Sequence, residues 1–286
     1  MLNRKRILAL LLFFVMLFSI VGCSGGRGTE GEQKTEQNTD DINDENLVGY
    51  SEGLEMNTNT SYCRVIGIGA CKDKHIVIPS EYEGVTVNGI MGSAFFGCGS
   101  FESVTIPESV IFINRGAFSD CSNLKSVFLP ANLQRIEASV FYGCISLESI
   151  VIPEKIVAIE ASTFCSCKQL NKVTLPDGLQ KIGGAAFSYC TSLTEITIPD
   201  SVTAIGIEAF RGCTSLKSIV LPEGMAVINE QTFRECVSLE TITIPESVKI
   251  ISSDAFVGCP NLKIIGKSGS CAEVYAKENN IPFKAQ

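Results

Sequence analysis

The 286-residue sequence contains no tryptophan and only one histidine, His75. With one histidine, most metal sites and histidine-assisted nucleophiles are excluded, because imidazole is the usual ligand and general base. Positive charge is also scarce: 23 Lys and Arg face 31 Asp and Glu, a net charge of −8 that disfavours a phosphate-binding surface. These deficits predict a non-enzymatic protein without a catalytic residue, cofactor, metal ion or nucleic-acid partner.

Apolar residues are plentiful, at 45% of the chain, which excludes disorder over the whole length. The 13 cysteines are too few to serve as a disulfide scaffold for a chain of this size. The sequence therefore predicts a folded body with a conventional apolar core.

The N-terminus carries the pattern of an export signal. Three basic residues, at 4–6, precede an apolar run over 7–20 and then Gly22-Cys23. The stretch 20–23, Ile-Val-Gly-Cys, resembles a bacterial lipobox. That resemblance implies a signal peptide over 1–22, lipidation of Cys23 and a protein anchored to the extracellular face of the cell membrane. An uncleaved transmembrane anchor is the alternative, since the apolar run is nearly long enough to span a bilayer.

Residues 23–47 read as a flexible acidic linker. Seven acids face two basic residues here, and apolar residues are almost absent, so this stretch cannot build a core. As a flexible coil its root-mean-square span is roughly 25–30 Å. We expect it to hold the folded domain, residues 48–286, away from the membrane.

One period of 23 residues organises the rest of the chain. Phenylalanine recurs at 95, 118, 141, 164, 187, 210, 233 and 256, and cysteine recurs three residues after each of them. Isoleucine precedes each of these phenylalanines by five residues, and proline recurs from 107 to 245. A fixed period of this length predicts a solenoid, in which each repeat stacks on the next and buries a continuous core.

A single repeat, residues 193–215, shows how the coil is built. Ile196 and Ile198 alternate with polar residues, as in a half-buried strand, and Pro199 ends that strand because it has no N–H. A second extended stretch turns Val202 and Ile205 inward, and Phe210 lies on a tight turn or short helix. We expect about eight such coils, spaced about 4.8 Å apart.

The pattern Leu-x-x-Ile-x-Ile-Pro-x-x-Val-x-x-Ile-x-x-x-Ala-Phe-x-x-Cys-x-x-Leu resembles the BspA-type leucine-rich repeat family of bacterial surface proteins. The resemblance implies a β-rich (α+β) solenoid, a right-handed superhelix with a parallel sheet on one face. It divides the domain into a lead-in segment (48–79), repeats (about 80–265) and a cap (266–286) whose helix is expected over 272–279. About five extra residues, around 82–87, should loop out of the first repeat. Adhesion or host-protein binding is the function that the resemblance implies.

The eight repeated cysteines should form one inward-facing column. Zinc needs ligands that converge tetrahedrally, and parallel Cβ directions are poor for disulfides, so we expect small buried apolar side chains. Cys165 lies outside the column and is expected to be the exposed, most reactive thiol. A disulfide between Cys63 and Cys71 is left open, and Cys271 stands alone in the cap.

The outward-facing strand positions define a candidate binding face. It is smooth, neutral and rich in hydroxyls, with one adjacent apolar pair and one expected cross-strand ion pair between Lys172 and Glu195. Its central residues are Ser126, Phe128, Ser149, Val151, Lys172, Thr174, Glu195 and Thr197. The predicted partner is a protein, such as a host surface or extracellular-matrix protein. A glycan-binding envelope module and a structural spacer are the alternatives.

Overall fold

The computed structural model describes residues 49–286. The expected signal peptide, the lipidation site Cys23 and the whole of the linker lie outside the described residues. The division into signal peptide, linker and repeat domain therefore stays a prediction.

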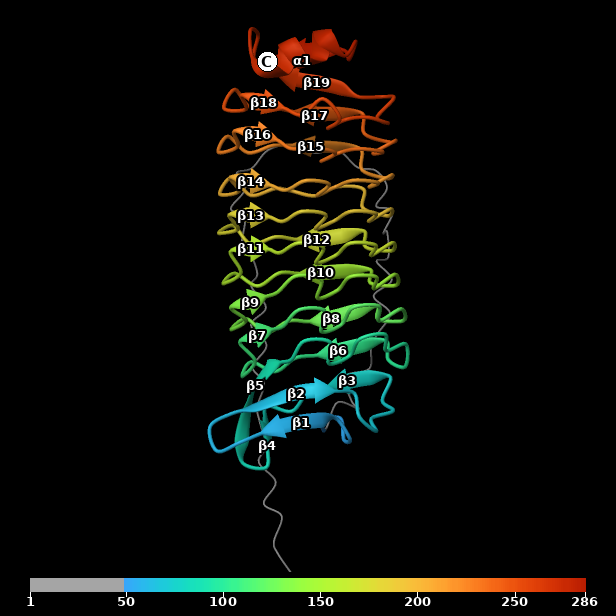
Figure 1. Cartoon of the computed structure of the whole chain (residues 1–286), viewed down its shortest axis with the longest axis vertical. Helices are drawn as coiled ribbons and strands as arrows, with labels where there is room; N and C mark the ends of the chain where they lie inside the picture. Colours follow the sequence, from blue (N-terminus) through green and yellow to red (C-terminus); the bar gives the residue numbers. More distant parts are fainter. Residues whose placement is uncertain (1–48) are drawn as a thin grey trace, which may run out of the picture. The chain divides into compact units, whose positions relative to one another are not determined.

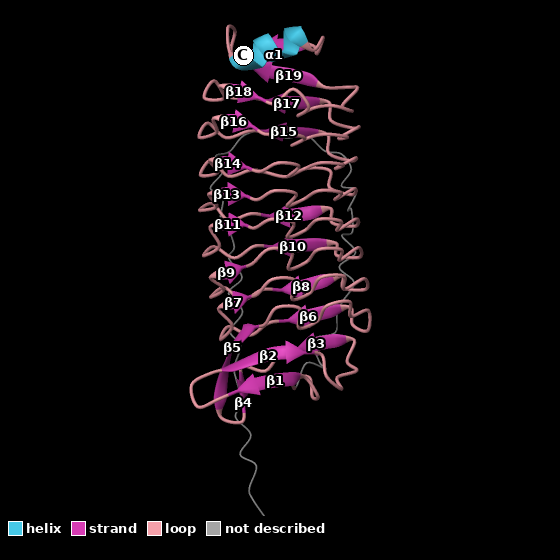
Figure 2. Cartoon of the chain, in the orientation of Figure 1, coloured by secondary structure: helices cyan, strands magenta, loops and turns pink. Residues whose placement is uncertain are grey.

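The described chain forms a parallel β-solenoid of about ten turns of about 23 residues. Two columns of short strands run along it, and one helix lies at the C-terminal end (Figures 1 and 2). The first column contains β3 (His75–Val77), β6 (Ser103–Thr105), β8 (Ser126–Phe128), β10 (Ser149–Val151), β12 (Lys172–Thr174), β15 (Ser218–Val220), β17 (Thr241–Thr243), β19 (Lys263–Gly266) and β20 (Phe283–Ala285). The second contains β5 (Val85–Ile90), β7 (Phe112–Ile113), β9 (Arg135–Ile136), β11 (Ala158–Ile159), β13 (Lys181–Ile182), β14 (Ala204–Ile205), β16 (Val227–Ile228) and β18 (Ile250–Ile251).

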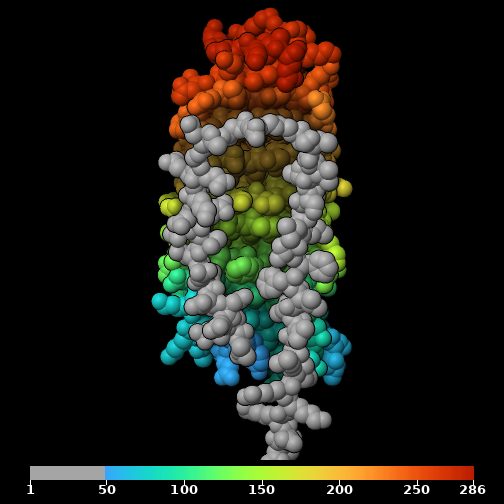
Figure 3. All heavy atoms as spheres, turned by 180° about the vertical axis from the view of Figure 1, so that it is seen from behind, coloured from blue at the N-terminus to red at the C-terminus, as the bar shows by residue number. Residues whose placement is uncertain are grey.

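The register of the strands confirms the predicted solenoid. Lys172 of β12 pairs with Ser149 of β10, and Ile205 of β14 pairs with Ile182 of β13, each 23 residues apart. Segments follow one another along the stack in sequence order, so each coil packs on its neighbours (Figure 3). The stack has about ten turns because the lead-in segment and the C-terminal cap add to the eight or so predicted repeats.

The first column is not one unbroken sheet. Its pairing is interrupted between β8 and β10, and again between β12 and β15. Residues 195–197, which fall in the second gap, adopt no regular strand. The expected Lys172–Glu195 ion pair is wrong: both side chains are exposed, and among residues 49–286 no ion pair joins them.

The eight repeated phenylalanines form a buried ladder through the core. Neighbouring rings from Phe118 to Phe256 are parallel, with centroids 5.4–5.6 Å apart. Each end of the ladder is closed by an edge-to-face aromatic contact, Phe101 against Phe95 and Tyr275 against Phe256. The predicted inward ladder is confirmed, and it runs the length of the repeats.

Tight turns present these phenylalanines to the core. The backbone is left-handed at the second residue after every repeated phenylalanine, with φ of 67° at Gly212 and 58° at Tyr189. The turns hydrogen-bond to each other between coils, as where the Phe187 N–H donates to the Ala209 carbonyl at 2.8 Å. Glycine is common at this position because it adopts positive φ without a steric penalty.

Both ends of the stack depart from the repeat. At the N-terminal end, β1 (Glu55–Thr58) pairs antiparallel with β2 (Cys63–Gly67), and β4 (Glu81–Tyr82) forms a hairpin with β5. The extra residues of the first repeat thus form this hairpin instead of an irregular loop. At the C-terminal end, α1 (Cys271–Glu278) buries Ala272, Tyr275 and Ala276 against the last coil, within one residue of the predicted helix.

Candidate interaction surface

The cysteine column is an internal feature of the coils. The thiol of Cys190 donates a hydrogen bond to the Phe164 carbonyl at 3.2 Å, and Cys213 bonds the Phe187 carbonyl in the same way at 3.1 Å. Burial raises the pKa of Cys213 to about 12 and that of Cys259, nearer the end, to about 11. Because the thiolate is the reactive form, these side chains are structural in the folded protein.

The cysteines outside the column also differ from some expectations. Cys165 is half-buried instead of exposed, and its burial raises the pKa of the thiol above its usual value, so it is not an activated nucleophile. Cys63 and Cys71 are both buried with free thiols, so the disulfide left open by the sequence is not formed. Cys271, in the cap, is partly exposed and also free.

His75 makes a contact that the sequence did not predict. Its Nδ1 lies 2.8 Å from the Ser103 hydroxyl on the neighbouring strand; His75 is exposed and Ser103 is half-buried. A catalytic pair needs a third group that orients the histidine and a cleft that excludes water. The nearby carboxylate of Glu102 is bonded to Lys125 at 2.8 Å, and the strand surface is open. The geometry is that of a cross-strand polar pair.

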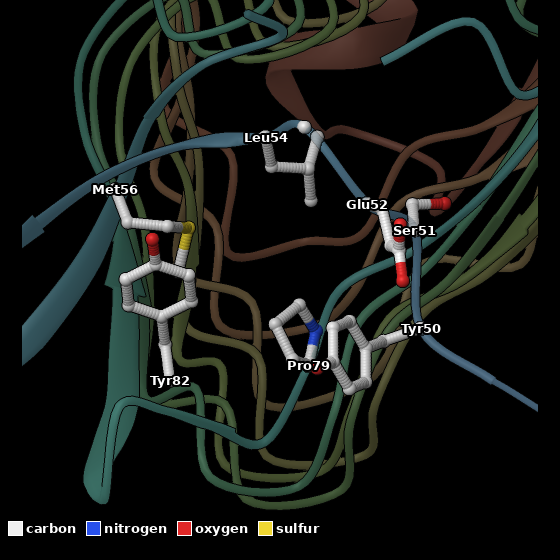
Figure 4. Close-up of a pocket in the computed structure, with 8 residues that line it drawn as sticks. Tyr50, Ser51, Glu52, Leu54, Met56, Pro79 and Tyr82 are labelled. Carbon is white, nitrogen blue, oxygen red and sulfur yellow. The ribbon is translucent and has the colours of Figure 1, made fainter. Parts of the chain in front are cut away.

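A shallow pocket lies at the N-terminal end of the stack. Its volume is about 190 Å³, below the roughly 300–1,000 Å³ of typical small-molecule sites. Tyr50, Leu54, Met56, Pro79 and Tyr82 form most of its wall, and Glu52 supplies its one carboxylate (Figure 4). These side chains contain no nucleophile paired with a base, so the pocket has no catalytic geometry.

The outward side of the first strand column is the best candidate for a binding site. Phe128 on β8 is 53% exposed and Val151 on β10 is 66% exposed, while their neighbours Val127 and Ile150 point into the core. The other predicted face residues also lie on the surface. Ser126 is half-buried, and the remaining five are exposed: Ser149, Lys172, Thr174, Glu195 and Thr197. We call these eight residues the sheet face.

The two borders of the sheet face differ in charge. On the border that precedes each strand, bases and acids alternate over the first four coils, and Glu102 pairs with Lys125 at 2.8 Å and Lys74 at 3.8 Å; the next two coils carry the uncharged Asn171 and Thr194. On the border that follows each strand, the residue after the repeated proline is acidic in five consecutive coils, and the last of these acids, Glu246, pairs with Lys267. The first four, which we call the acidic border, are Glu154, Asp177, Asp200 and Glu223.

Residues 49–286 lack two other kinds of feature. Within that range, no group of three or more His, Cys, Asp or Glu side chains is arranged to hold a metal ion. Nor does that range contain a helix of the length and apolarity needed to cross a membrane.

The fold and the repeat together define a leucine-rich repeat solenoid. The family profile of the BspA-type leucine-rich repeat region, with six copies, matches residues 70–153, 88–206 and 134–263, and the chain belongs to this family. No curated protein matches the sequence. Leucine-rich repeat families are generally non-enzymatic scaffolds for protein interaction.

Solved structures of two bacterial leucine-rich repeat proteins are similar to this chain. The T. pallidum leucine-rich repeat protein TpLRR is 25% identical, with a TM-score of 0.53, over 82% of this chain and 97% of that one. A leucine-rich cell surface protein of Faecalibacterium prausnitzii A2-165 is 22% identical, with a TM-score of 0.41, over 83% of this chain and 98% of that one.

Sequence reasoning missed the acidic border and the thiol hydrogen bonds. The acidic border was visible in the sequence because an acid follows each repeated proline from Pro153 onward, a signal that a count of net charge does not reveal. The thiol bonds had no comparable signal, because the carbonyl acceptor lies 26 residues earlier, on the preceding coil.

Proposed function

We propose that this protein is an exported, lipid-anchored and non-enzymatic surface protein that binds another protein through its sheet face. The observation that carries the proposal is the exposure of Phe128 and Val151 on a strand surface that no other described element covers. The name of the F. prausnitzii relative, a cell surface protein, supports the location. Residues 20–23 support the lipid anchor.

The chemistry of the sheet face favours a protein partner over a sugar. Binding energy in protein interfaces is concentrated in a few aromatic and apolar anchors surrounded by polar groups that exclude water. Phe128 and Val151 are such anchors, and Ser126, Ser149 and Thr174 are short hydroxyl side chains that lose little entropy on contact. A glycan site would present more aromatic rings, and Phe128 is the only aromatic residue among the eight of the sheet face.

Binding is tested by comparing two doubly substituted proteins. The full chain with Phe128→Ser and Val151→Ser should lose capture of extracellular-matrix proteins in a surface-binding assay. The matched control is Val157→Ser with Ile250→Ser, because these side chains are similarly exposed, at 53% and 60%, and lie at the second strand column, Val157 just before β11 and Ile250 on β18. Equal capture by both proteins would refute the sheet face, and strong binding on a glycan array would favour the glycan alternative.

Anchoring is tested separately at Cys23. The Cys23→Ser protein should lose labelling by radioactive palmitate and its retention in the membrane fraction, because the thiol that accepts the lipid is gone. Cys271→Ser, which removes a partly exposed thiol of the cap, is the control. Continued labelling of the Cys23→Ser protein would show that the lipobox interpretation is wrong.

A further inference from the structure

We propose that the partner of the sheet face is a basic protein segment, bound as a helix whose Lys or Arg side chains run along the acidic border. This inference rests on the proposed function, because it names the class of partner for that same face. It draws on three observations: unneutralised charge, adjacent exposed apolar side chains, and the spacing of the coils.

The four carboxylates of the acidic border are not neutralised by the folded domain. All four are exposed, and among residues 49–286 none of them makes an ion pair or accepts a side-chain hydrogen bond. Lys155 lies beside Glu154 in sequence, but its ammonium group donates to the Asn132 amide oxygen at 2.8 Å. The border ends where Glu246 pairs with Lys267 at 2.5 Å.

Exposed apolar side chains lie on the first and last of the same four coils, close in sequence to the acids. Val151 and Val220, 66% and 65% exposed, precede Glu154 and Glu223 by three residues, and Thr174 and Thr197 occupy the equivalent positions between them. A strip of two valines and two threonines therefore runs parallel to the four carboxylates. When a partner covers the strip, the partner residues beside its apolar contacts lie over the four carboxylates. Charge complementarity requires those partner residues to be positively charged.

The spacing of the coils selects a helix over an extended strand. The four acids span three coil steps. The span is about 14 Å if each step equals the spacing of strands in a sheet. It is about 17 Å if each step equals the 5.4–5.6 Å separation of the core rings. Four cations on one helix face, at i, i+4, i+7 and i+11, span about 16 Å. Four cations on one side of an extended strand span about 20 Å and lose register.

The test uses the purified full chain and a defined probe. The probe is a 20-residue helical peptide with lysines at i, i+4, i+7 and i+11 and alanine or leucine beside them. Its affinity, measured by fluorescence anisotropy, should fall about tenfold or more in the protein with Glu154→Gln, Asp177→Asn, Asp200→Asn and Glu223→Gln. It should also weaken as salt is raised, since the carboxylates are exposed.

Two controls separate the geometry from bulk charge. A protein with Glu81→Gln, Glu160→Gln, Glu230→Gln and Glu278→Gln carries the same change in net charge away from the acidic border and should bind the probe normally. A peptide of the same composition with its lysines spread around the helix should bind at least tenfold more weakly to the unsubstituted protein. Equal losses in the two substituted proteins, or equal affinity for the two peptides, would overturn the inference.

Its failure is distinguishable from failure of the proposed function. Phe128→Ser with Val151→Ser tests whether the sheet face binds any protein partner. If that protein loses capture while the neutralised acidic border changes nothing, the sheet face stands and the basic helix is refuted. If the unsubstituted chain does not bind the lysine peptide at all, the basic helix is likewise refuted.

Discussion

Replacing one ring of the phenylalanine ladder tests the packing on which the solenoid depends. Phe187 is completely buried, and its ring lies 5.4 Å from that of Phe164 and 5.5 Å from that of Phe210. Phe187→Ala removes both stacking contacts and leaves a cavity, which costs about 3–5 kcal/mol in a core that does not collapse. For a domain of this size that lowers Tm by about 6–20 °C.

Circular dichroism during heating measures the loss, with Phe128→Ala as the matched control. Phe128 is half-exposed, so its truncation should change the free energy of unfolding by about 0.5 kcal/mol or less. Because each coil packs only on its neighbours, Phe187→Ala should also increase amide exchange most in the two adjoining coils. Equal Tm values for the two proteins would refute the reasoning that the ladder holds the coils together.

Two further predictions concern the thiols. Cys190→Ser keeps a donor for the Phe164 carbonyl and should be about 1 kcal/mol more stable than Cys190→Ala in urea unfolding; the reverse order would mean that the sulfur only fills space. Burial raises the pKa of Cys213 to about 12 from 9.0, so its contribution to stability is fully present below pH 9 and is lost as pH rises toward 12. The urea midpoint should therefore fall between pH 9 and pH 11 by more than it does in Cys213→Ala, and parallel curves would contradict this.

The repeat itself was predictable because stacking translates a sequence period directly into spatial position. Phe210 and Ile205 recur with period 23, and large apolar side chains that recur in every coil are buried when all of the copies point inward. The cap helix was expected from the family resemblance, and in the structure its buried face includes Ala272 and Ala276, four residues apart.

Details that depend on contacts between non-equivalent positions were not predictable. The half-burial of Cys165 follows from the packing of neighbouring turns, which the period does not describe. The sheet interruption around Glu195 depends on small backbone differences between coils that carry the same pattern. The approach of His75 to Ser103 spans 28 residues, because the β4–β5 hairpin adds residues to that coil.

The left-handed residue in each turn has a consequence for how such a chain can grow. Because that conformation recurs at the same place in every coil, one coil can be copied or deleted without disturbing the geometry of the next. Duplicating a 23-residue unit would extend the rod by about 5 Å and add one more step to any linear surface along it. The length of the solenoid and the number of equivalent surface positions along it can therefore change by whole repeats during evolution, with the two end caps unchanged.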